Sequence, residues 1–232
     1  MFKYITSVFS LLAIILIAPL HAMSLNHSMY NYAGIVPVIT DDHNQTWVYF
    51  GVEYINNKKT LALLAGGQEK KDINSLATAL RELNEESLDV FDDYINIHNL
   101  TNKSLPEINY NIWLVISTKL FLYTNRTAWA DEYCDKFISL YNQRRYAGKG
   151  DYQKLSRSQR ENYELRKVKL EDLLSFLKDP NHFDYQLISY GGKNCLHDDP
   201  LPLRWSTRII LRNQPALQEL LSHSNTNLAV TQ

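Results

Sequence analysis

The feature that most constrains this chain is a pair of glycines followed by a helix that carries three carboxylates on one side. Residues 66–67 mark a turn, and residues 76–88 have the apolar spacing of an amphipathic helix. On such a helix Glu82, Glu85 and Glu86 stand at i, i+3 and i+4. They therefore share one face within a single turn.

Three like charges on one face repel, and the neighbouring cation in the sequence is Arg81, four residues before Glu85. A bound cation would supply the missing positive charge. Oxygen ligands suit hard cations such as Mg²⁺ or Mn²⁺, which are typically held by one or two carboxylates together with substrate phosphates. The alternative is a solvated face of an ordinary surface helix with Leu76, Leu80 and Leu83 on its apolar side.

The segment around this helix favours the metal site over the solvated face. Residues 60–65 are an apolar run that predicts a buried strand leading directly into the glycine turn. The segment GGQEKKDINSLATALRELNEES resembles the Nudix box, a glycine loop and helix with the pattern Gly, five residues, Glu, seven residues, Arg-Glu-aliphatic-x-Glu-Glu-x-Gly-aliphatic. The residues that match it without a gap are Gly67, Arg81, Glu82, Leu83, Glu85 and Glu86.

Two positions depart from the box. Ile73 stands where the family has an isolated Glu that braces the loop and the box Arg, with Asp72 one residue earlier. Leu88 stands where the family has a Gly that ends the helix, and Asp89 follows it in place of an aliphatic residue. The metal-binding centre is thus kept while its framing changes.

The resemblance implies an α/β/α sandwich with a mixed sheet and, in this chain, a helical insertion. It also implies a Nudix-type pyrophosphohydrolase in which Glu82, Glu85 and Glu86 bind the metal, the Gly67 carbonyl adds a ligand, and one glutamate serves as base. Arg81 is expected to hold the carboxylates in place. An acidic residue before a late strand completes the metal site in the family, and Glu164 is the candidate, with Glu161 as the second choice.

The same departures motivate a second hypothesis, a Nudix-fold binding or effector protein that has lost turnover. A third is a structural domain whose acidic helix face is merely solvated. The three hypotheses predict different results. A hydrolase cleaves its substrate in the presence of metal, a binding or effector protein binds a ligand without cleaving it, and a structural domain does neither.

Composition limits the partners. The 232 residues, 45% of them hydrophobic, can bury the core of one enzyme-sized domain. The balance of 24 basic and 25 acidic residues shows no basic surplus of the kind that binds nucleic-acid polymers. A small phosphorylated substrate remains compatible with this balance.

The N-terminus predicts export. Lys3 precedes an apolar run over residues 8–20, and Ala22 offers a small residue for cleavage, so residues 1–22 are typical of a secretory signal peptide. An uncleaved membrane anchor is the alternative, although the run is short for a span of ~20 residues. Cleavage would leave a secreted or periplasmic protein without stable membrane association, in which Cys134 and Cys195 either pair or remain separate thiols.

The rest of the chain supports one domain over residues 33–213, preceded by a segment at 23–32 and followed by a short helix and a loose tail at 214–232. The polar stretch 125–163 is the expected insertion, with helices at 129–146 and 151–163. Its Lys and Arg residues suit either a solvated face or substrate phosphate. The other expected elements are strands at 34–39, 46–54, 60–65 and 112–123, a strand and helix within 164–176, and helices at 205–212 and 215–223.

Overall fold

The computed structural model describes residues 30–91, 100–101, 108–112, 114–146, 162–178, 186–193 and 198–212. The chain divides into two compact units, Met1–Tyr30 and Asn31–Gln232, and the fold described below is that of the second. The predicted signal peptide, Cys195, Glu161 and the helices expected at 151–163 and 215–223 lie wholly or largely outside the described residues.

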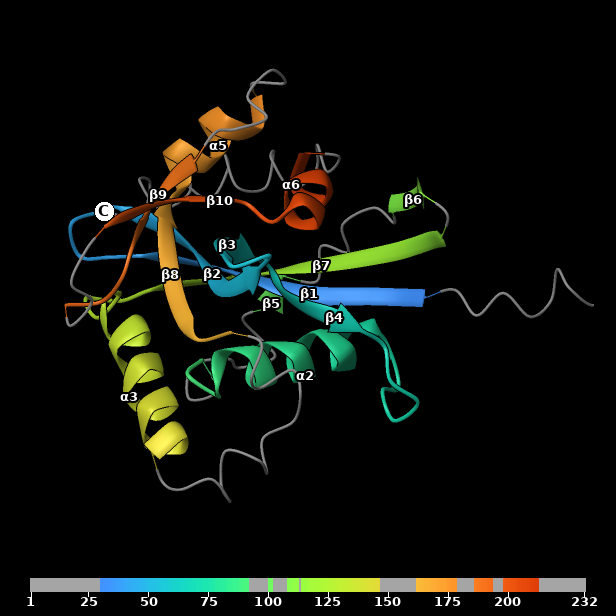
Figure 1. The fold of residues 1–232 in the computed structure, drawn as a ribbon, viewed down its shortest axis with the longest axis horizontal. Helices are drawn as coiled ribbons and strands as arrows, with labels where there is room; N and C mark the ends of the chain where they lie inside the picture. Colours follow the sequence, from blue (N-terminus) through green and yellow to red (C-terminus); the bar gives the residue numbers. More distant parts are fainter. Residues whose placement is uncertain are drawn as a thin grey trace, which may run out of the picture. The chain divides into compact units, whose positions relative to one another are not determined.

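The second unit is built around one mixed β-sheet (Figure 1). Its main order is β10-β9-β8-β2-β1-β7-β5, with β3 on β2, β4 on β1 and β6 on β7. The strands are β1 (Tyr30–Thr40), β2 (Thr46–Ile55), β3 (Lys58–Ala62), β4 (Leu64–Gly67), β5 (Leu100–Thr101), β6 (Ile108–Ile112), β7 (Leu114–Arg126), β8 (Glu164–Lys169), β9 (Gln186–Tyr190) and β10 (Asp199–Pro202).

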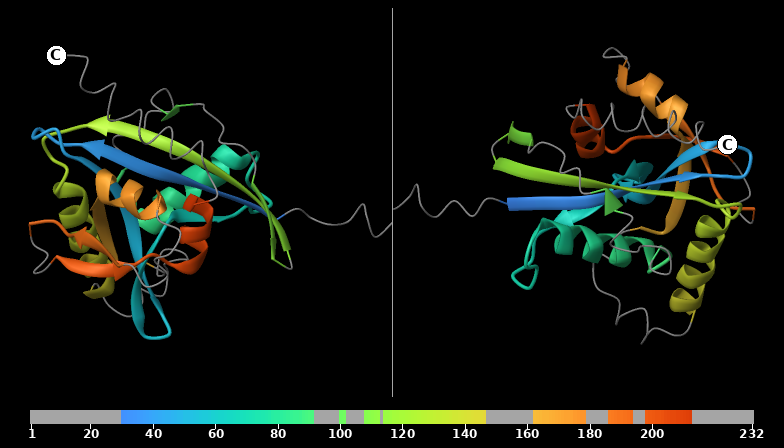
Figure 2. Two further views of the ribbon diagram at one scale, coloured as in Figure 1. Left: turned by 90° about the horizontal axis from the view of Figure 1, so that it is seen from above. Right: turned by 180° about the vertical axis from the view of Figure 1, so that it is seen from behind.

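The sheet is mixed because the neighbouring strands β1 and β7 run parallel to each other. The Thr127 N–H donates to the Thr40 carbonyl (2.9 Å), and these residues stand at the carboxyl ends of the two strands. Figure 2 shows both arrows pointing the same way. The other pairs with a defined register, including the β1–β2 hairpin, are antiparallel.

Helices cover both faces of the sheet, as the predicted α/β/α arrangement requires (Figure 2). They are α2 (Ser75–Ser87), α3 (Glu132–Tyr146), α5 (Leu170–Lys178) and α6 (Trp205–Arg212). Strand residues alternate between two apolar cores. Tyr49 contributes to the core with α2 and α3, whereas its neighbours Val48 and Phe50 contribute to the core with α5 and α6. This alternation follows from the two-residue period of a strand.

The strand expected at 60–65 is two strands, β3 and β4, interrupted at Leu63. β3 pairs with β2 over residues 51–55, and β4 pairs with β1 over residues 32–35, whereas β1 and β2 pair with each other at 38–40. Pro37 lies at this change of partner. Because proline has no N–H for a ladder bond, its position between the two pairings avoids the loss of such a bond.

Helix α2 coincides with the expected box helix, and both of its ends are capped. At its start, the Asn74 side chain accepts from the Ala77 N–H (2.8 Å), an N-cap worth about 1 kcal/mol. At its end, Leu88 adopts the left-handed conformation (φ 57°, ψ 40°) and its N–H donates to Asn84 O. Leu88 therefore makes the helix-ending turn for which the box uses Gly, and its side chain is buried in the core with α2 and α3.

Sequence patterns identified β1, β2, β7, the α5 segment and α6, but they missed β9 and β10, which form an antiparallel pair beside β8. On α3, Cys134 is buried in the core with α2. In the ranges that the structure describes, no helix combines the length and apolar character needed to cross a membrane.

Leu88→Gly tests which of two opposing effects dominates at the end of α2. The left-handed conformation costs a non-glycine residue about 1 kcal/mol, which the substitution would recover. It also removes a fully buried leucine side chain, a loss of about 2–5 kcal/mol. We expect the free energy of unfolding to fall by about 1–3 kcal/mol in urea denaturation.

Asp89→Gly is the matched control, since Asp89 has the same handedness (φ 63°) and a half-exposed side chain. The free energy of unfolding of the Asp89→Gly variant should be unchanged or slightly higher than that of the unsubstituted chain. A Leu88→Gly protein as stable as the unsubstituted chain would show that backbone strain outweighs packing at this position.

Candidate active site

The box helix is joined to the sheet through Glu86. The Glu86 Oε2 accepts from the Ala65 N–H (2.8 Å), so a carboxylate on α2 is hydrogen-bonded to the backbone of β4. Ala65 pairs with Gly34 of β1, and Gly67 pairs with Tyr32. The site is therefore built at the start of β1, where the turn after β4 begins.

Gly66 permits the close approach of Glu82 to that turn. A Cβ atom on Gly66 would lie 2.3 Å from the Glu82 Cδ and Oε1 atoms, which is too short for any side chain. The Glu82 carboxylate is 8% exposed and is held by Arg81, so little room exists for it to move aside. Gly67, by contrast, has open space where its Cβ would be. The need for glycine thus falls on Gly66.

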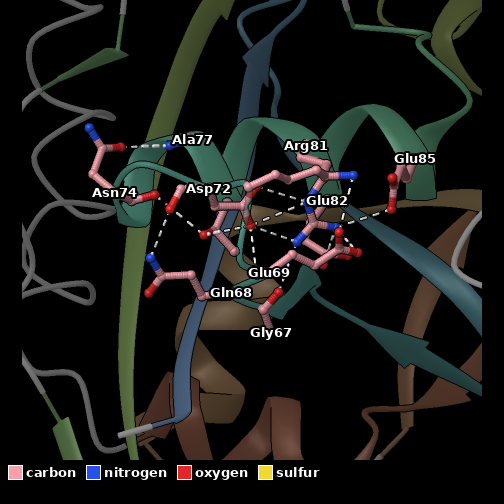
Figure 3. Close-up of polar contacts among 11 residues, drawn as sticks. Gly67, Gln68, Glu69, Asp72, Asn74, Ala77, Arg81, Glu82 and Glu85 are labelled. Atoms are coloured by element: carbon pink, nitrogen blue, oxygen red, sulfur yellow. Dashed lines mark hydrogen bonds and ion pairs between the residues drawn. The ribbon is translucent and has the colours of Figure 1, made fainter. Parts of the chain in front are cut away.

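Arg81 is the centre of the site (Figure 3). Its side chain is 12% exposed and its Nη2 donates to the Gly67 carbonyl (2.8 Å). One guanidinium also faces four carboxylates, those of Glu82 (2.7 Å), Asp72 (3.0 Å), Glu85 (3.2 Å) and Glu69 (3.6 Å). Arg81 thus contacts two of the three box glutamates.

Asp72 braces the loop in the place of the missing box glutamate. It accepts from the Arg81 Nε and Nη2, from the Glu69 N–H (2.9 Å) and from the Thr78 hydroxyl (3.1 Å). Ile73, at the family's Glu position, is 89% exposed. A carboxylate one residue early therefore supplies the bracing that the sequence alignment with the box assigned to position 73.

The donor set has the chemistry of a Mg²⁺ or Mn²⁺ site, because it consists of carboxylate oxygens whose charge one Arg offsets in part. Gly66 also leaves room for the Glu82 carboxylate directly beside the turn. In the described part of the chain, however, no three acidic, His or Cys side chains are grouped around a common point. In this structure Glu82 and Glu85 bond to Arg81, while Glu86 bonds to Ala65.

Glu164, the predicted additional metal ligand, has different partners. It pairs with Lys59 (2.9 Å) and with Arg166, whose Nε and Nη2 lie 2.8 and 2.7 Å away. Burial raises the pKa of Glu164, but hydrogen bonds from Lys59 and Arg166 outweigh it and hold that pKa below its ordinary value. Its neighbour Leu165 faces the core with α2, so strand alternation directs Glu164 to the opposite face.

Asn162 reaches the box where Glu164 does not. Its Nδ2 donates to the Glu86 carbonyl (3.4 Å) near the end of α2. The Asn162 amide also fills the space over Gly51 of β2, where an added Cβ would lie 2.3 Å from it. Sequence analysis missed this residue, and a contact across 76 positions leaves no local signal.

A cavity of about 510 Å³ lies at the other end of β1 and shares no lining residue with the box. Its walls include Trp47, Asp131, Lys167 and Tyr190. Lys167 forms an ion pair with Asp131, and its ammonium lies 3.9 Å from the centroid of the Trp47 ring. Lys167 and Asp131 in this cavity are thus paired with each other.

No protein-family model and no curated protein matches the chain. Solved structures with a similar arrangement include the C. elegans Ap4A hydrolase, at 13% identity and a TM-score of 0.36, covering 63% of this chain and 85% of that one. A binary complex of the C. elegans enzyme gives 12% identity and a TM-score of 0.41, with 86% and 98% covered. A MutT/nudix family protein from Enterococcus faecalis gives 12% and 0.43, with 84% and 68% covered. All three TM-scores lie below 0.5, so the functional proposal rests on the site itself.

The Asp72–Arg81 contact predicts a pH-dependent contribution to stability. Hydrogen bonds from Arg81 lower the pKa of Asp72 from 3.8 to about 2, against the opposing effect of burial. A group whose pKa is lower in the folded state stabilises the fold above its unfolded pKa and loses that effect as pH falls through the folded value. Asp72→Asn should cost about 1–2 kcal/mol at pH 7, and the difference from wild type should shrink between about pH 4 and pH 2.

Urea denaturation of both proteins across this pH range provides the measurement. Asp42→Asn is the control, because the Asp42 side chain is 57% exposed and its partner, His43, is also on the surface. A difference between wild type and Asp72→Asn that stays constant from pH 7 to pH 2 would contradict the assignment.

Proposed function

We propose that this chain is a metal-dependent hydrolase that cleaves a diphosphate linkage in a nucleoside diphosphate derivative or a related compound. The observation that carries the proposal is the contact of one partly buried residue, Arg81, with four carboxylates beside a glycine turn. Lys71 also pairs with Glu69 (3.1 Å), but the other three carboxylates around Arg81 still favour the binding of a further cation. A substrate with a diphosphate group would share such a metal.

Glu82, Glu85 and Glu86 are the residues that would hold Mg²⁺ or Mn²⁺, with the Gly67 carbonyl as a further candidate. The metal, when bound, would neutralise the diphosphate oxygens and lower the pKa of a coordinated water molecule. The protein's own contribution is orientation. Arg81 positions Glu82 and Glu85, and the Ala65 N–H fixes one oxygen of Glu86.

One of the three glutamates would accept the proton of the attacking water, and the base is not assigned among them. Glu85 is the more accessible of the two that bond to Arg81, since its side chain is 20% exposed and that of Glu82 is 8% exposed. Glu85 is therefore the residue to substitute first, because the change perturbs packing least.

The substrate we propose is a small phosphorylated molecule and not a nucleic-acid polymer, because the net charge of −1 offers no basic surplus for a polyanion. We also propose that the protein is exported, on the basis of residues 1–22. An exported enzyme of this kind would act on diphosphate compounds outside the cytoplasm or in a periplasm.

The second candidate is a binding protein that keeps the site without turnover. It is favoured by the position of Arg81, whose bonds to Glu82 and Glu85 occupy oxygens that a metal would need. On this view a ligand binds at the box with measurable affinity but is not cleaved.

Activity is tested by incubating the mature protein with ADP-ribose, dinucleoside polyphosphates, nucleoside triphosphates and sugar nucleotides, each with Mg²⁺ or Mn²⁺. We expect metal-dependent cleavage of at least one compound, abolished by EDTA. Glu85→Gln should lower kcat by about 100-fold or more, because it removes one charge from the proposed metal and base site. Chromatography of the products provides the readout.

Glu171→Gln is the control, since the Glu171 side chain is 64% exposed on α5 and lies outside the box. Tight binding of one compound without product would favour the binding protein. If the protein neither binds nor cleaves any of these compounds, the result would favour the structural domain with a solvated acidic face.

Export predicts the mature N-terminus. Cleavage after Ala22 would make Met23 the first residue of the protein purified from the native source. Edman sequencing or intact-mass measurement determines this directly. A chain that begins at Met1 would contradict cleavage and favour the uncleaved membrane anchor.

A further inference from the structure

The N-terminus of α6 is attached to the strand that leads into the box. The Arg204 N–H donates to the Leu61 carbonyl (2.7 Å), and Leu203 forms a parallel bridge with Leu61. One turn into α6, the Thr207 hydroxyl accepts from the Leu63 N–H (3.1 Å). The backbone positions of Arg204 and Thr207 are therefore set by β3 and the residue after it.

The same strand segment continues directly to the carboxylates. Two residues beyond Leu63, Ala65 bonds to Glu86 through its N–H, and its carbonyl accepts from the Tyr32 hydroxyl (2.7 Å). The four residue steps from Leu61 to Ala65 span ~13 Å if the chain is extended, at ~3.3 Å per residue. A long arginine side chain and a bound diphosphate can together bridge that separation.

The Arg204 side chain contacts Glu53 through one of its nitrogens and is partly exposed. Its Nη1 donates to both oxygens of Glu53, at 3.0 and 2.8 Å. Glu53 is the buried partner, with 11% of its side chain exposed, whereas 40% of the Arg204 side chain is exposed. Among the described residues, Glu53 is the carboxylate that Arg204 contacts, and the printed contacts involve its Nη1 alone.

Tyr32 indicates that the box and the Glu53–Arg204 pair act on a common region. Burial, and next the charge of Glu86, raise the pKa of the Tyr32 hydroxyl; Glu53 and Glu82 also raise it, and Arg204 lowers it. Electrostatic interactions of this kind fall off with distance. The charges of the box glutamates and of the Glu53–Arg204 pair therefore both act on the Tyr32 hydroxyl, which is hydrogen-bonded to Ala65.

The surroundings of Arg204 favour an anion further. The first turn of α6 contains no acidic residue, so no carboxylate of the helix itself offsets the positive end of its dipole. The other arginine near the site, Arg81, is less suited to bind an anion, because its guanidinium already contacts four carboxylates. A diphosphate at the box would need a cation other than Arg81.

We propose that Arg204 binds a phosphate oxygen of the substrate, with Glu53 orienting its guanidinium. This proposal rests on the proposed function, since it assigns the phosphate-binding cation of the same site. Two parallel N–H donors on a guanidinium match two phosphate oxygens. Arg204 is thus a substrate-binding residue that acts on affinity more than on the chemical step.

The test measures binding and turnover separately. Titration calorimetry with methylene diphosphonate and Mg²⁺ gives the Kd for a diphosphate that cannot be cleaved, and the compound found in the activity screen gives KM and kcat. Arg204→Ala should raise both Kd and KM at least 10-fold while kcat changes less than about 3-fold. Arg204→Lys should retain part of the affinity, because it keeps the charge and loses the paired donors.

A charge-matched variant separates binding from folding. Glu53→Gln with Arg204→Gln keeps the net charge of the pair and a hydrogen-bonding contact, yet it should weaken diphosphate binding as much as Arg204→Ala. Arg126→Ala is the control, since Arg126 contacts Asn44 at the opposite end of β1. The melting temperature of each variant shows whether it is folded.

The outcomes distinguish this proposal from the proposed function. A wild-type protein that cleaves its substrate, with unchanged Kd and KM in the charge-matched variant, would overturn the role of Arg204 and leave the hydrolase intact. A wild-type protein that neither binds methylene diphosphonate nor cleaves any compound would overturn both. A specific loss of affinity in the Arg204 variants supports both.

Discussion

The rest of the site depends on the contact between Arg81 and its carboxylates. Glu82 and Glu85 come from the same helix as Arg81, while Glu69 and Asp72 come from the preceding loop. A guanidinium offers five donors in a rigid fork, which allows it to serve several oxygens at once. The loop and the helix are thus joined by one residue, and the negative charge that remains accounts for the proposed need for a metal.

The segment from β3 to β4 connects this charged centre to the rest of the fold. β3 pairs with β2 and β4 pairs with β1, so the chain changes its partner strand just before the glycine turn. Glu86 bonds to this segment at Ala65, and α6 bonds to it at Leu61 and Leu63. Helices from both sides of the sheet are therefore positioned against the same short stretch of backbone.

The sequence predicted the elements whose signals are local. Helix α2 and the β1–β2 hairpin follow from apolar periodicity and turn residues, and α6 was predicted with its observed bounds. The interruption at Leu63 was missed because it results from the change of partner between β2 and β1. The β9–β10 pair was missed because pairing at the edge of a sheet depends on tertiary contacts more than on strand propensity.

The sequence by itself determined the order of carboxylates around Arg81 and the helix that presents them, since both depend on spacing along a few turns. Tertiary structure decided which residues complete the site. Asp72 replaces the expected glutamate because the loop turns its carboxylate toward Arg81 and leaves Ile73 in solvent. Glu164 bonds to Lys59 and Arg166, while Asn162 reaches Glu86. The Glu164–Lys59 and Asn162–Glu86 contacts join residues 105 and 76 positions apart, and they depend on strand register and on the face toward which each side chain points.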